Sequence, residues 1–414
     1  MGLIEGLGPG DWPRFPLWVV APRSKESGMP DGRLLSVFLE AGVVPRDSRD
    51  DNHNQLGEDL SRYLVVRPGD IVFNKLRSWQ GGIGVSQYDG IVSPAYYVCH
   101  PGTGWYSRFL HYLLRSKPYL TEITRISKWM PPSQFDTPWD LLRCLPVLTP
   151  PLEEQRRIAD FLDAETSRID RVHELHGRVG QKLTERHFSL VDAALRELAK
   201  THAEISFRRV VRRIEQGHSP ECDAAPASND EWAVLKLSSI KRGIFNGAEN
   251  KLLPSNVRPM RRAEVHPGDL LITRANTPDL VGDSAVADDT SRMRLLPDLI
   301  YRVVLNDDID PRFASIAING GRIRSLIQSV ARGSSQSMVK LRGEDIRQWP
   351  MPLPPLDVQL AFVQEVEDNR RLTDGLRHKI NRQLALLAER RQALITAAVT
   401  GQLDVTTARS GVRA

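Results

Sequence analysis

The sequence has few cysteines and no long apolar run. Its three cysteines, Cys99, Cys144 and Cys222, lie far apart, with no Cys-x-x-Cys spacing. This pattern favours free thiols in a reducing compartment over a disulfide framework or a structural metal site. No apolar stretch approaches the roughly 20 residues that a bilayer-spanning helix needs, and the first residues lack the basic-then-apolar order of a secretory signal. We therefore expect a cytoplasmic protein that does not associate with membranes.

The sequence also lacks the common motifs of a catalytic centre. There is no P-loop, no glycine-rich dinucleotide fingerprint and no Asn-Pro-Pro-Tyr-type tetrapeptide. His173 and His176 lie in His-Glu-Leu-His, which does not have the spacing of a zinc-protease helix. Glu249 and Lys251 form an acid-x-lysine pair, but no Pro-Asp pair precedes them at the distance that a nuclease site needs. The sequence therefore predicts no catalytic residue, no metal site and no cofactor.

The chain contains enough apolar and charged residues for more than one folded core. Of its 414 residues, 41% are hydrophobic and 26% are charged, which is typical of soluble globular proteins. This length predicts two or more domains. The net charge of +5 permits a polyanionic partner without requiring one, so the positions of the basic residues matter more than their number.

Part of the chain is repeated. The string PVLTPPLEEQ at Pro146–Gln155 returns as PMPLPPLDVQ at Pro350–Gln359, a shift of 204 residues, and the similarity continues without a gap through the helical patterns that follow. Upstream, RPGDIVFNKLR at residues 67–77 resembles HPGDLLITRAN at residues 266–276, at a shift of 199. The chain is therefore organised as two variable units, each followed by a similar long helix.

Each repeated string precedes apolar residues at heptad-like spacing. A narrow apolar seam on a long helix predicts pairing with another helix rather than with a sheet. We expect the two helices to form an antiparallel coiled coil that keeps the two units at a set separation. The Pro-Pro steps favour a rigid, extended approach to each helix. The predicted seam consists of Ile158, Leu162, Ile169, Val172, Val179, Leu183, Leu190, Phe362, Val366, Leu376, Ile380, Leu387 and Leu394.

The repeat sets the predicted domain organisation. The expected fold class is α+β, with two β-rich units joined by a long two-helix antiparallel coiled coil and related by a pseudo-two-fold internal repeat. Turn signals such as Pro68-Gly69-Asp70, followed by the strand-like run Ile71-Val72-Phe73, indicate the β-rich units. The predicted parts are residues 1–145, the first unit; 146–200, the central helix; 201–349, the second unit; 350–405, the distal helix; and 406–414, a flexible tail.

Both units contain basic residues interleaved with amides and aromatics. Arg and Lys donors match phosphates and guanine edges, and Asn and Gln match adenine, so these residues predict contacts with double-stranded DNA. Composition alone favours ordinary solvated loop charges, with Trp79 and Trp129 as packing residues. The duplicated architecture favours DNA contacts instead, because two basic units on a rigid spacer suit the reading of two short sites on one duplex. The predicted DNA-binding residues are Asn74, Lys75, Arg77, Trp79, Gln80 and Lys128 in the first unit, and Arg274, Asn276, Arg332, Gln336, Lys340 and Arg342 in the second.

Several motifs, taken in order, resemble a known family. PGDIVFNKLRSWQGGIGVS, PPLEEQRRIADFLD, RGSSQSMVKLRGEDIRQWPMPLPPLDVQ and ERRQALITAAVTGQLDV together resemble the specificity subunits of type I restriction-modification enzymes, over nearly the entire chain. The resemblance implies target-recognition domains at residues 1–145 and 201–349, each reading one half of an interrupted DNA target. It also implies that the helices form a spacer that docks two methyltransferase subunits. Restriction-translocase subunits join through the methyltransferase subunits, and these partners together carry all catalysis.

Two other functions remain open at this stage. A non-catalytic scaffold would recruit partners through its coiled coil and bind DNA without sequence choice. A stand-alone nuclease would need an acidic cluster, which the sequence lacks. The chain also departs from the family pattern, because the first helix lacks the Thr-Gly ending and the first unit has SKWMPPSQ where the second has the Gly-Ser-Ser-Gln run.

Overall fold

The computed structural model describes residues 4, 6–39, 41–48, 59–130, 134–222, 225–228, 230–331 and 339–406. The chain forms two compact units. Unit 1 comprises Met1–Gly177 with Asn381–Ala414, and unit 2 comprises Arg178–Ile380. Each unit therefore contains one half of each long helix and has its own apolar core. None of the helices among the described residues combines the length and the apolar character needed to cross a membrane.

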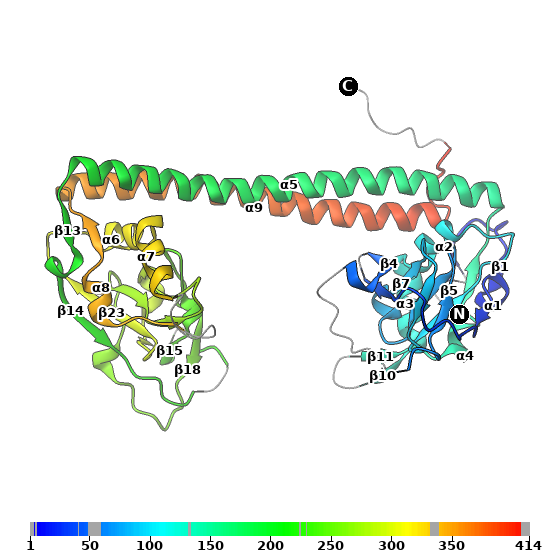
Figure 1. Ribbon diagram of the computed structural model, residues 1–414, viewed down its shortest axis with the longest axis horizontal. Coiled ribbons are helices and arrows are strands. Elements are labelled where there is room, and N and C mark those ends of the chain that lie inside the picture. The colour runs from blue at the N-terminus through cyan, green and yellow to red at the C-terminus, as the bar shows by residue number, and fades with distance from the viewer. Residues whose placement is uncertain are drawn as a thin grey trace. The chain divides into compact units, whose positions relative to one another are not determined.

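Unit 1 is built on a four-stranded antiparallel sheet with the strand order β2-β9-β6-β7. Helices α2 and α3 pack on this sheet, and four short strand pairs, β1–β12, β3–β4, β5–β8 and β10–β11, complete the described part of the unit (Figure 1). Its elements are β1 (Arg14–Pro16), α1 (Leu17–Val20), β2 (Arg23–Ser24), β3 (Leu35–Phe38), β4 (Gly42–Pro45), β5 (Leu64–Val66), β6 (Ile71–Asn74), β7 (Ile83–Val85), β8 (Gly90–Val92), β9 (Tyr96–Cys99), α2 (Ser107–Leu114), α3 (Lys117–Ile126), β10 (Lys128–Met130), β11 (Gln134–Asp136), α4 (Trp139–Leu142) and β12 (Pro146–Leu148).

Unit 2 has a four-stranded antiparallel sheet of corresponding strands, in the order β14-β23-β19-β21. Its elements are β13 (Glu204–Ser206), β14 (Val211–Gln216), β15 (Ala233–Leu235), β16 (Ile240–Lys241), β17 (Ile244–Phe245), β18 (Asn250–Leu252), β19 (Leu270–Thr273), β20 (Ala275–Asn276), β21 (Ser284–Val286), β22 (Arg294–Leu295), β23 (Ile300–Leu305), α6 (Pro311–Asn319), α7 (Gly321–Ala331), β24 (Val339–Lys340), α8 (Gly343–Arg347) and β25 (Pro350–Pro352).

The same turn leads into β6 and into β19. In each turn a glycine has a positive φ, +93° at Gly69 and +94° at Gly268, which only glycine adopts without strain. The aspartate that follows closes the turn by accepting a backbone N–H three residues back, at 2.7 Å for Asp70 and 2.9 Å for Asp269. The repeated Pro-Gly-Asp string thus sets where each of these central strands begins.

The long helices are α5 (Leu152–Thr201) and α9 (Leu356–Val399). They begin later than the predicted 146 and 350, because the first residues of each repeated string form the strands β12 and β25. These strands pair with β1 and β13. The Pro-Pro step then follows, and the N–H groups of Glu154 and Gln155, in the first turn of α5, donate back to the Pro151 carbonyl. The prolines therefore join a sheet strand directly to a helix.

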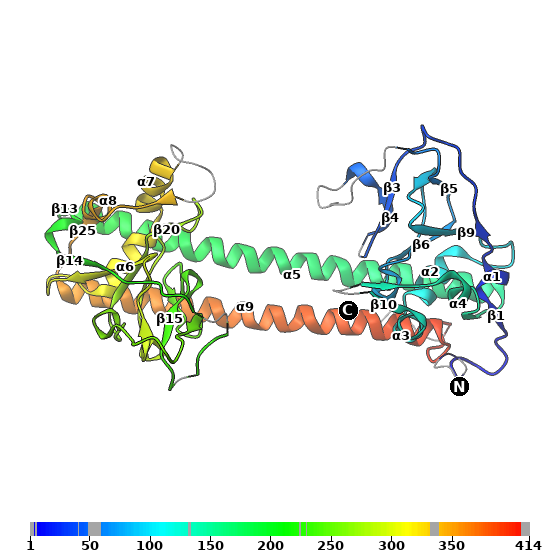
Figure 2. The ribbon, with the colours of Figure 1, turned by 90° about the horizontal axis from the view of Figure 1, so that it is seen from below.

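The two helices lie side by side and antiparallel within each unit (Figures 1 and 2). In unit 1, the Nε atom of Arg391 lies 3.2 Å from an Oδ1 atom of Asp170. In unit 2, the His187 ring contacts the side chain of Asn369 at 3.2 Å. Residue numbers rise along one helix as they fall along the other, which confirms the predicted antiparallel pairing.

The predicted apolar seam is buried in the first turns of each helix and half-buried or exposed further along. Ile158, Leu162, Ile169 and Phe362 are buried, and Val172, Leu183, Val366, Ile380, Leu387 and Leu394 are half-buried. The prediction is wrong at Val179, Leu190 and Leu376, which are 49%, 46% and 39% exposed. The facing positions belong instead to Gly180 and His187: a Cβ at Gly180 would lie 4.0 Å from Ile380. A heptad pattern that counts only apolar residues misses a glycine that allows two helices to approach closely.

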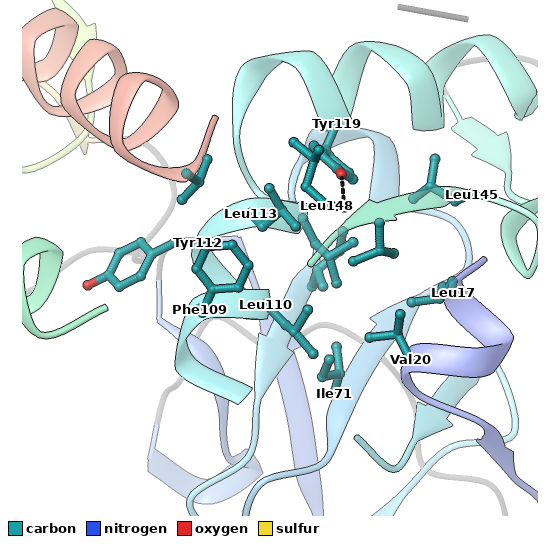
Figure 3. Close-up of a cluster of buried hydrophobic side chains, with 14 of the residues drawn as sticks. Leu17, Val20, Ile71, Phe109, Leu110, Tyr112, Leu113, Tyr119, Leu145 and Leu148 are labelled. Carbon is teal, nitrogen blue, oxygen red and sulfur yellow. Dashed lines mark hydrogen bonds between the residues drawn. The ribbon is translucent and has the colours of Figure 1, made fainter. Parts of the chain in front are cut away.

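The core of unit 1 joins the sheet, α2, α3 and the start of α5 (Figure 3). Phe109, Leu110 and Leu113 of α2 are fully buried beside Ile71 of β6. The Tyr119 hydroxyl of α3 accepts the Leu148 N–H at 3.0 Å and donates to the Pro146 carbonyl at 3.1 Å. This phenol therefore fixes β12, and with it the start of α5, to the body of the unit.

Candidate nucleic-acid interface

Predicted basic residues occupy equivalent positions at the ends of the central strands. Lys75 directly follows β6, and Arg274 directly follows β19. The Lys75 carbonyl accepts the Thr137 N–H at 3.0 Å, and the Arg274 carbonyl accepts the Leu341 N–H at 2.8 Å. In both units, therefore, the segment that leads into the next short helix, α4 or α8, is bonded to the basic residue.

A tyrosine lies beneath each of these two cations. The Lys75 ammonium is 4.9 Å from the ring centroid of Tyr97, and the Arg274 guanidinium is 5.7 Å from that of Tyr301. Both tyrosines are almost fully buried, and their hydroxyls donate to the carbonyls of Thr137 and Leu341. The ring face attracts each positive group and orients it. The alignment of residues 67–77 with residues 266–276 pairs Lys75 with Arg274, which agrees with this arrangement.

The loop after β6 divides the other first-unit candidates into packed and open residues. The Trp79 indole donates to the Leu76 carbonyl at 3.1 Å, and its ring lies 4.9 Å from that of Phe135, so Trp79 mainly packs. Arg77 and Gln80 are exposed, and within the described residues their side chains have no hydrogen-bond or ion-pair partner. These two residues are therefore available for a ligand.

Asn74 and Lys128 lie on either side of this loop. The Asn74 side chain accepts the Leu76 N–H at 3.0 Å and borders a cavity of about 300 Å³, which Arg77 also lines. Lys128 is exposed on the β10–β11 hairpin, opposite Asp136 in the strand register. Beside it, Trp129 exposes 54% of its surface, an unusually large fraction for a tryptophan and typical of an aromatic residue at a binding surface.

The second-unit candidates gather around the short pair β20–β24. Asn276 accepts the Thr277 N–H at 2.8 Å, and Lys340 is exposed opposite Ala275 in the register. Arg342 is exposed at the start of α8, with its backbone N–H bonded to the Asp345 carboxylate at 2.8 Å. Arg332 and Gln336 lie outside the described residues.

Two arginines that were not predicted hold the loops that carry these candidates. Arg115, the residue directly after α2, donates to the carbonyls of Gly81 and Ile83, at 2.9 and 2.8 Å, and also to that of Leu39. In unit 2, Arg324 of α7 donates to the carbonyls of Val281 and Asp279, at 2.7 and 2.6 Å. Burial lowers the pKa of both guanidinium groups, which nevertheless remain charged at any physiological pH. An arginine on a helix gives no local pattern that reveals such contacts.

The glutamine of each repeated string is a second feature that was missed. Gln155 is 1% exposed; it accepts the Tyr106 N–H at 2.8 Å and donates to the Pro150 carbonyl at 2.8 Å. Gln359 is fully buried and makes matching bonds to the Asp310 N–H and the Pro354 carbonyl, both at 2.8 Å. Tyr106 and Asp310 are the residues just before α2 and α6. The repetition of this glutamine at the same place in both strings was the signal that could have revealed the role.

Other titratable groups lie in the cores. Burial raises the pKa of the Cys99 thiol and that of the Tyr119 phenol. Burial also raises the pKa of Asp283, against the opposing effect of Arg324 at 3.2 Å. Among the residues that the structure describes, no three His, Cys, Asp or Glu side chains gather as a metal site would require. The exposed groups described above are suited to binding a polyanion through charge and hydrogen bonds.

The fold is that of a chain from a type I restriction-modification system. A solved structure from a study of complex assembly and conformational transition in such a system aligns with 96% of this chain and 99% of its own length, with a TM-score of 0.70 and 18% identity. No protein-family model matches the chain.

Sequence relatives narrow the class. The chain is 30% identical over 173 residues to the EcoEI specificity subunit of Escherichia coli, a match that spans 41% of this chain and 29% of that protein. It is 24% identical over 331 residues to the EcoKI specificity subunit of Escherichia coli K12, spanning 74% of this chain and 68% of that protein. The chain is thus a relative of the type I restriction enzyme specificity subunits, which confirms the resemblance noted in its motifs.

Proposed function

We propose that this chain is the DNA-recognition subunit of a type I restriction-modification complex. In this role it reads an interrupted, two-part target on double-stranded DNA and performs no chemical step itself. The observation that carries the proposal is the matched placement of Lys75 and Arg274 at the ends of corresponding strands, in two units with the same sheet order. Two similar units, each with exposed basic and amide groups, suit the reading of two half-sites.

The proposed partners supply the chemistry. Two methyltransferase subunits would dock on α5 and α9 and methylate adenine, and restriction-translocase subunits would join through them. Large apolar residues on these helices support a docking role, since Leu175 and Leu372 are 50% and 67% exposed. Such a complex would act on cytoplasmic DNA, so we also propose a cytoplasmic location.

Within each unit, specificity would come from differences in binding free energy. A bidentate contact to one base is worth about 1 to 3 kcal/mol, and its loss relaxes one position of the target. Arg77 and Gln80 in unit 1, and Lys340 and Arg342 in unit 2, are exposed residues that could provide such contacts.

The test is the adenine methylation pattern of a methylation-free host. The host expresses the neighbouring methyltransferase either alone or together with this chain, and methylated adenines are mapped across its genome. We expect an interrupted two-part motif that appears only when both proteins are present. If the two proteins co-purify but no motif appears, the proposed function is wrong, and a scaffold that binds DNA without sequence choice replaces it.

A further inference from the structure

Two cations of unit 1, Arg23 and Lys75, contact the same aromatic ring, and neither forms an ion pair with an acid among the described residues. The Arg23 guanidinium, on β2, lies 4.6 Å from the ring centroid of Tyr97 and 5.4 Å from that of Trp139. Lys75 lies 4.9 Å from the same Tyr97 ring. Two cations therefore share one aromatic side chain that is itself 5% exposed.

The N–H donors of the Arg23 side chain find no acceptor among the described residues. Its Nε atom is buried without a hydrogen-bond partner, and within the described residues its side chain forms no hydrogen bond and no ion pair. Contact with Tyr97 and Trp139 orients the guanidinium, while no acceptor among the described residues binds its N–H groups. A half-buried arginine held in this way is prepared to bind a ligand with two adjacent acceptor atoms.

Lys75 is only partly satisfied by the protein. Its ammonium donates to the Pro94 carbonyl at 3.0 Å, which leaves two N–H groups. The negative charge of Asp136 acts on Lys75 from a distance, but the two side chains form no ion pair. Burial and the charge of Arg23 both lower the pKa of Lys75, which indicates that the two cations lie within electrostatic reach of each other. An anion bound by both cations would relieve this repulsion.

We propose that Arg23 and Lys75, oriented by Tyr97 and Trp139, form a binding site for one phosphate group of the DNA backbone. This inference rests on the proposed function. A phosphodiester offers two oxygens to the arginine fork and a full negative charge to both cations. A guanine edge is neutral and needs a single fork, so it does not account for the second cation.

Unit 2 lacks half of this site. Arg23 lies opposite Cys99 in the strand register, and the corresponding position opposite Val303 is Ile214. Among the described residues, Arg274 is therefore the one cation stacked on Tyr301, and it donates to the Asp298 carbonyl at 3.3 Å. The phosphate site is accordingly a property of unit 1, and it predicts that unit 1 contributes more to the salt dependence of DNA binding.

The test measures DNA binding by the chain assembled with its methyltransferase. One duplex carries the motif mapped by methylation and a second carries a scrambled sequence, and KCl is varied from about 50 to 200 mM, the range over which counterion release strongly changes affinity. The variants are Arg23→Gln, Lys75→Met and the double variant. Arg67→Ala is the matched control, because it removes the same charge from unit 1 while its guanidinium is already bonded to Glu26 by two contacts of 2.7 Å.

We expect the double variant to reduce the slope of log affinity against log salt by about 1, with both duplexes weakened by the same factor. The mapped motif stays unchanged, and the control keeps the original slope. Arg23→Lys keeps the charge and restores part of the slope, which separates charge from a loss of folding. Because Arg23 forms no hydrogen bond, the unfolding temperature of Arg23→Gln stays close to that of the unaltered chain.

Two results would overturn the site. An unchanged slope in the double variant means that no phosphate is bound there. Weaker binding of the cognate duplex alone, with a relaxed motif, means that Arg23 contacts a base. If the unaltered complex binds both duplexes equally, the proposed function is wrong, and the slope of the double variant still decides whether the phosphate site exists.

Discussion

Replacing Gln155 with alanine tests how each unit is attached to its long helix. Gln155 accepts the Tyr106 N–H and donates to the Pro150 and Gly104 carbonyls, at 2.8, 2.8 and 3.3 Å. Two well-formed bonds contribute about 1 kcal/mol each, and the buried N–H left without an acceptor costs roughly 1 to 3 kcal/mol more. We therefore expect Gln155→Ala to lower the free energy of unfolding of unit 1 by about 3 to 5 kcal/mol.

Hydrogen exchange followed by mass spectrometry measures this effect locally. Loss of about 3 kcal/mol corresponds to exchange roughly 100-fold faster in the peptide that contains Tyr106 and the start of α2. Gln181→Ala is the matched control on the same helix, since Gln181 is exposed and bonds only Glu185, so we expect a change within about 0.5 kcal/mol. Equal exchange in the two variants would refute the idea that Gln155 attaches α2 to the helix start.

Three further predictions concern a buried histidine, two arginines that hold loops, and the length of α5. Burial lowers the pKa of His111 to about 3 in the folded protein, whereas the unfolded chain binds a proton there at a pKa of about 6.5. The free energy of unfolding should therefore fall by about 2 kcal/mol between pH 7 and pH 5. Urea unfolding of His111→Asn should show a smaller fall, and an equal fall would contradict this. Arg115→Ala should weaken methylation of one half-site and Arg324→Ala of the other, in methylation assays with half-site variants; equal losses at both half-sites would argue against loop positioning. Four residues inserted into α5 lengthen it by about 6 Å, so the unread gap should change or activity should cease; an unchanged target would show that the helices set no spacing.

The repeat made much of the fold predictable. Pro-Pro-Leu-x-x-Gln marks both helix starts, and Pro-Gly-Asp marks the turns before β6 and β19, because proline and glycine restrict the backbone locally. Heptad-like spacing gave the antiparallel helix pair. The residues at which the two helices face each other were harder to predict from the sequence. Gly180 allows close helix approach by lacking a side chain, and His187 forms a hydrogen bond across to α9.

The candidate site was predictable only where residues are close in sequence. Lys75 and Arg274 follow strands that the pattern indicates, so their positions could be inferred. Arg23 approaches Lys75 only because β9 lies between β2 and β6 in the sheet, and strand order is not encoded in any local pattern. In the same way, Gln155 meets Tyr106 and Arg115 meets Leu39 through tertiary packing across long stretches of chain.

The central claim, that each unit independently reads one half of the target, is tested most directly by exchanging one unit. Residues 17–145 are replaced by the corresponding segment of a relative with a different target, and methylated adenines are mapped in a host that also expresses the methyltransferase. The account predicts that one half of the motif changes to that of the donor, while the other half and the gap length stay the same. A motif in which both halves change, or neither, would contradict it.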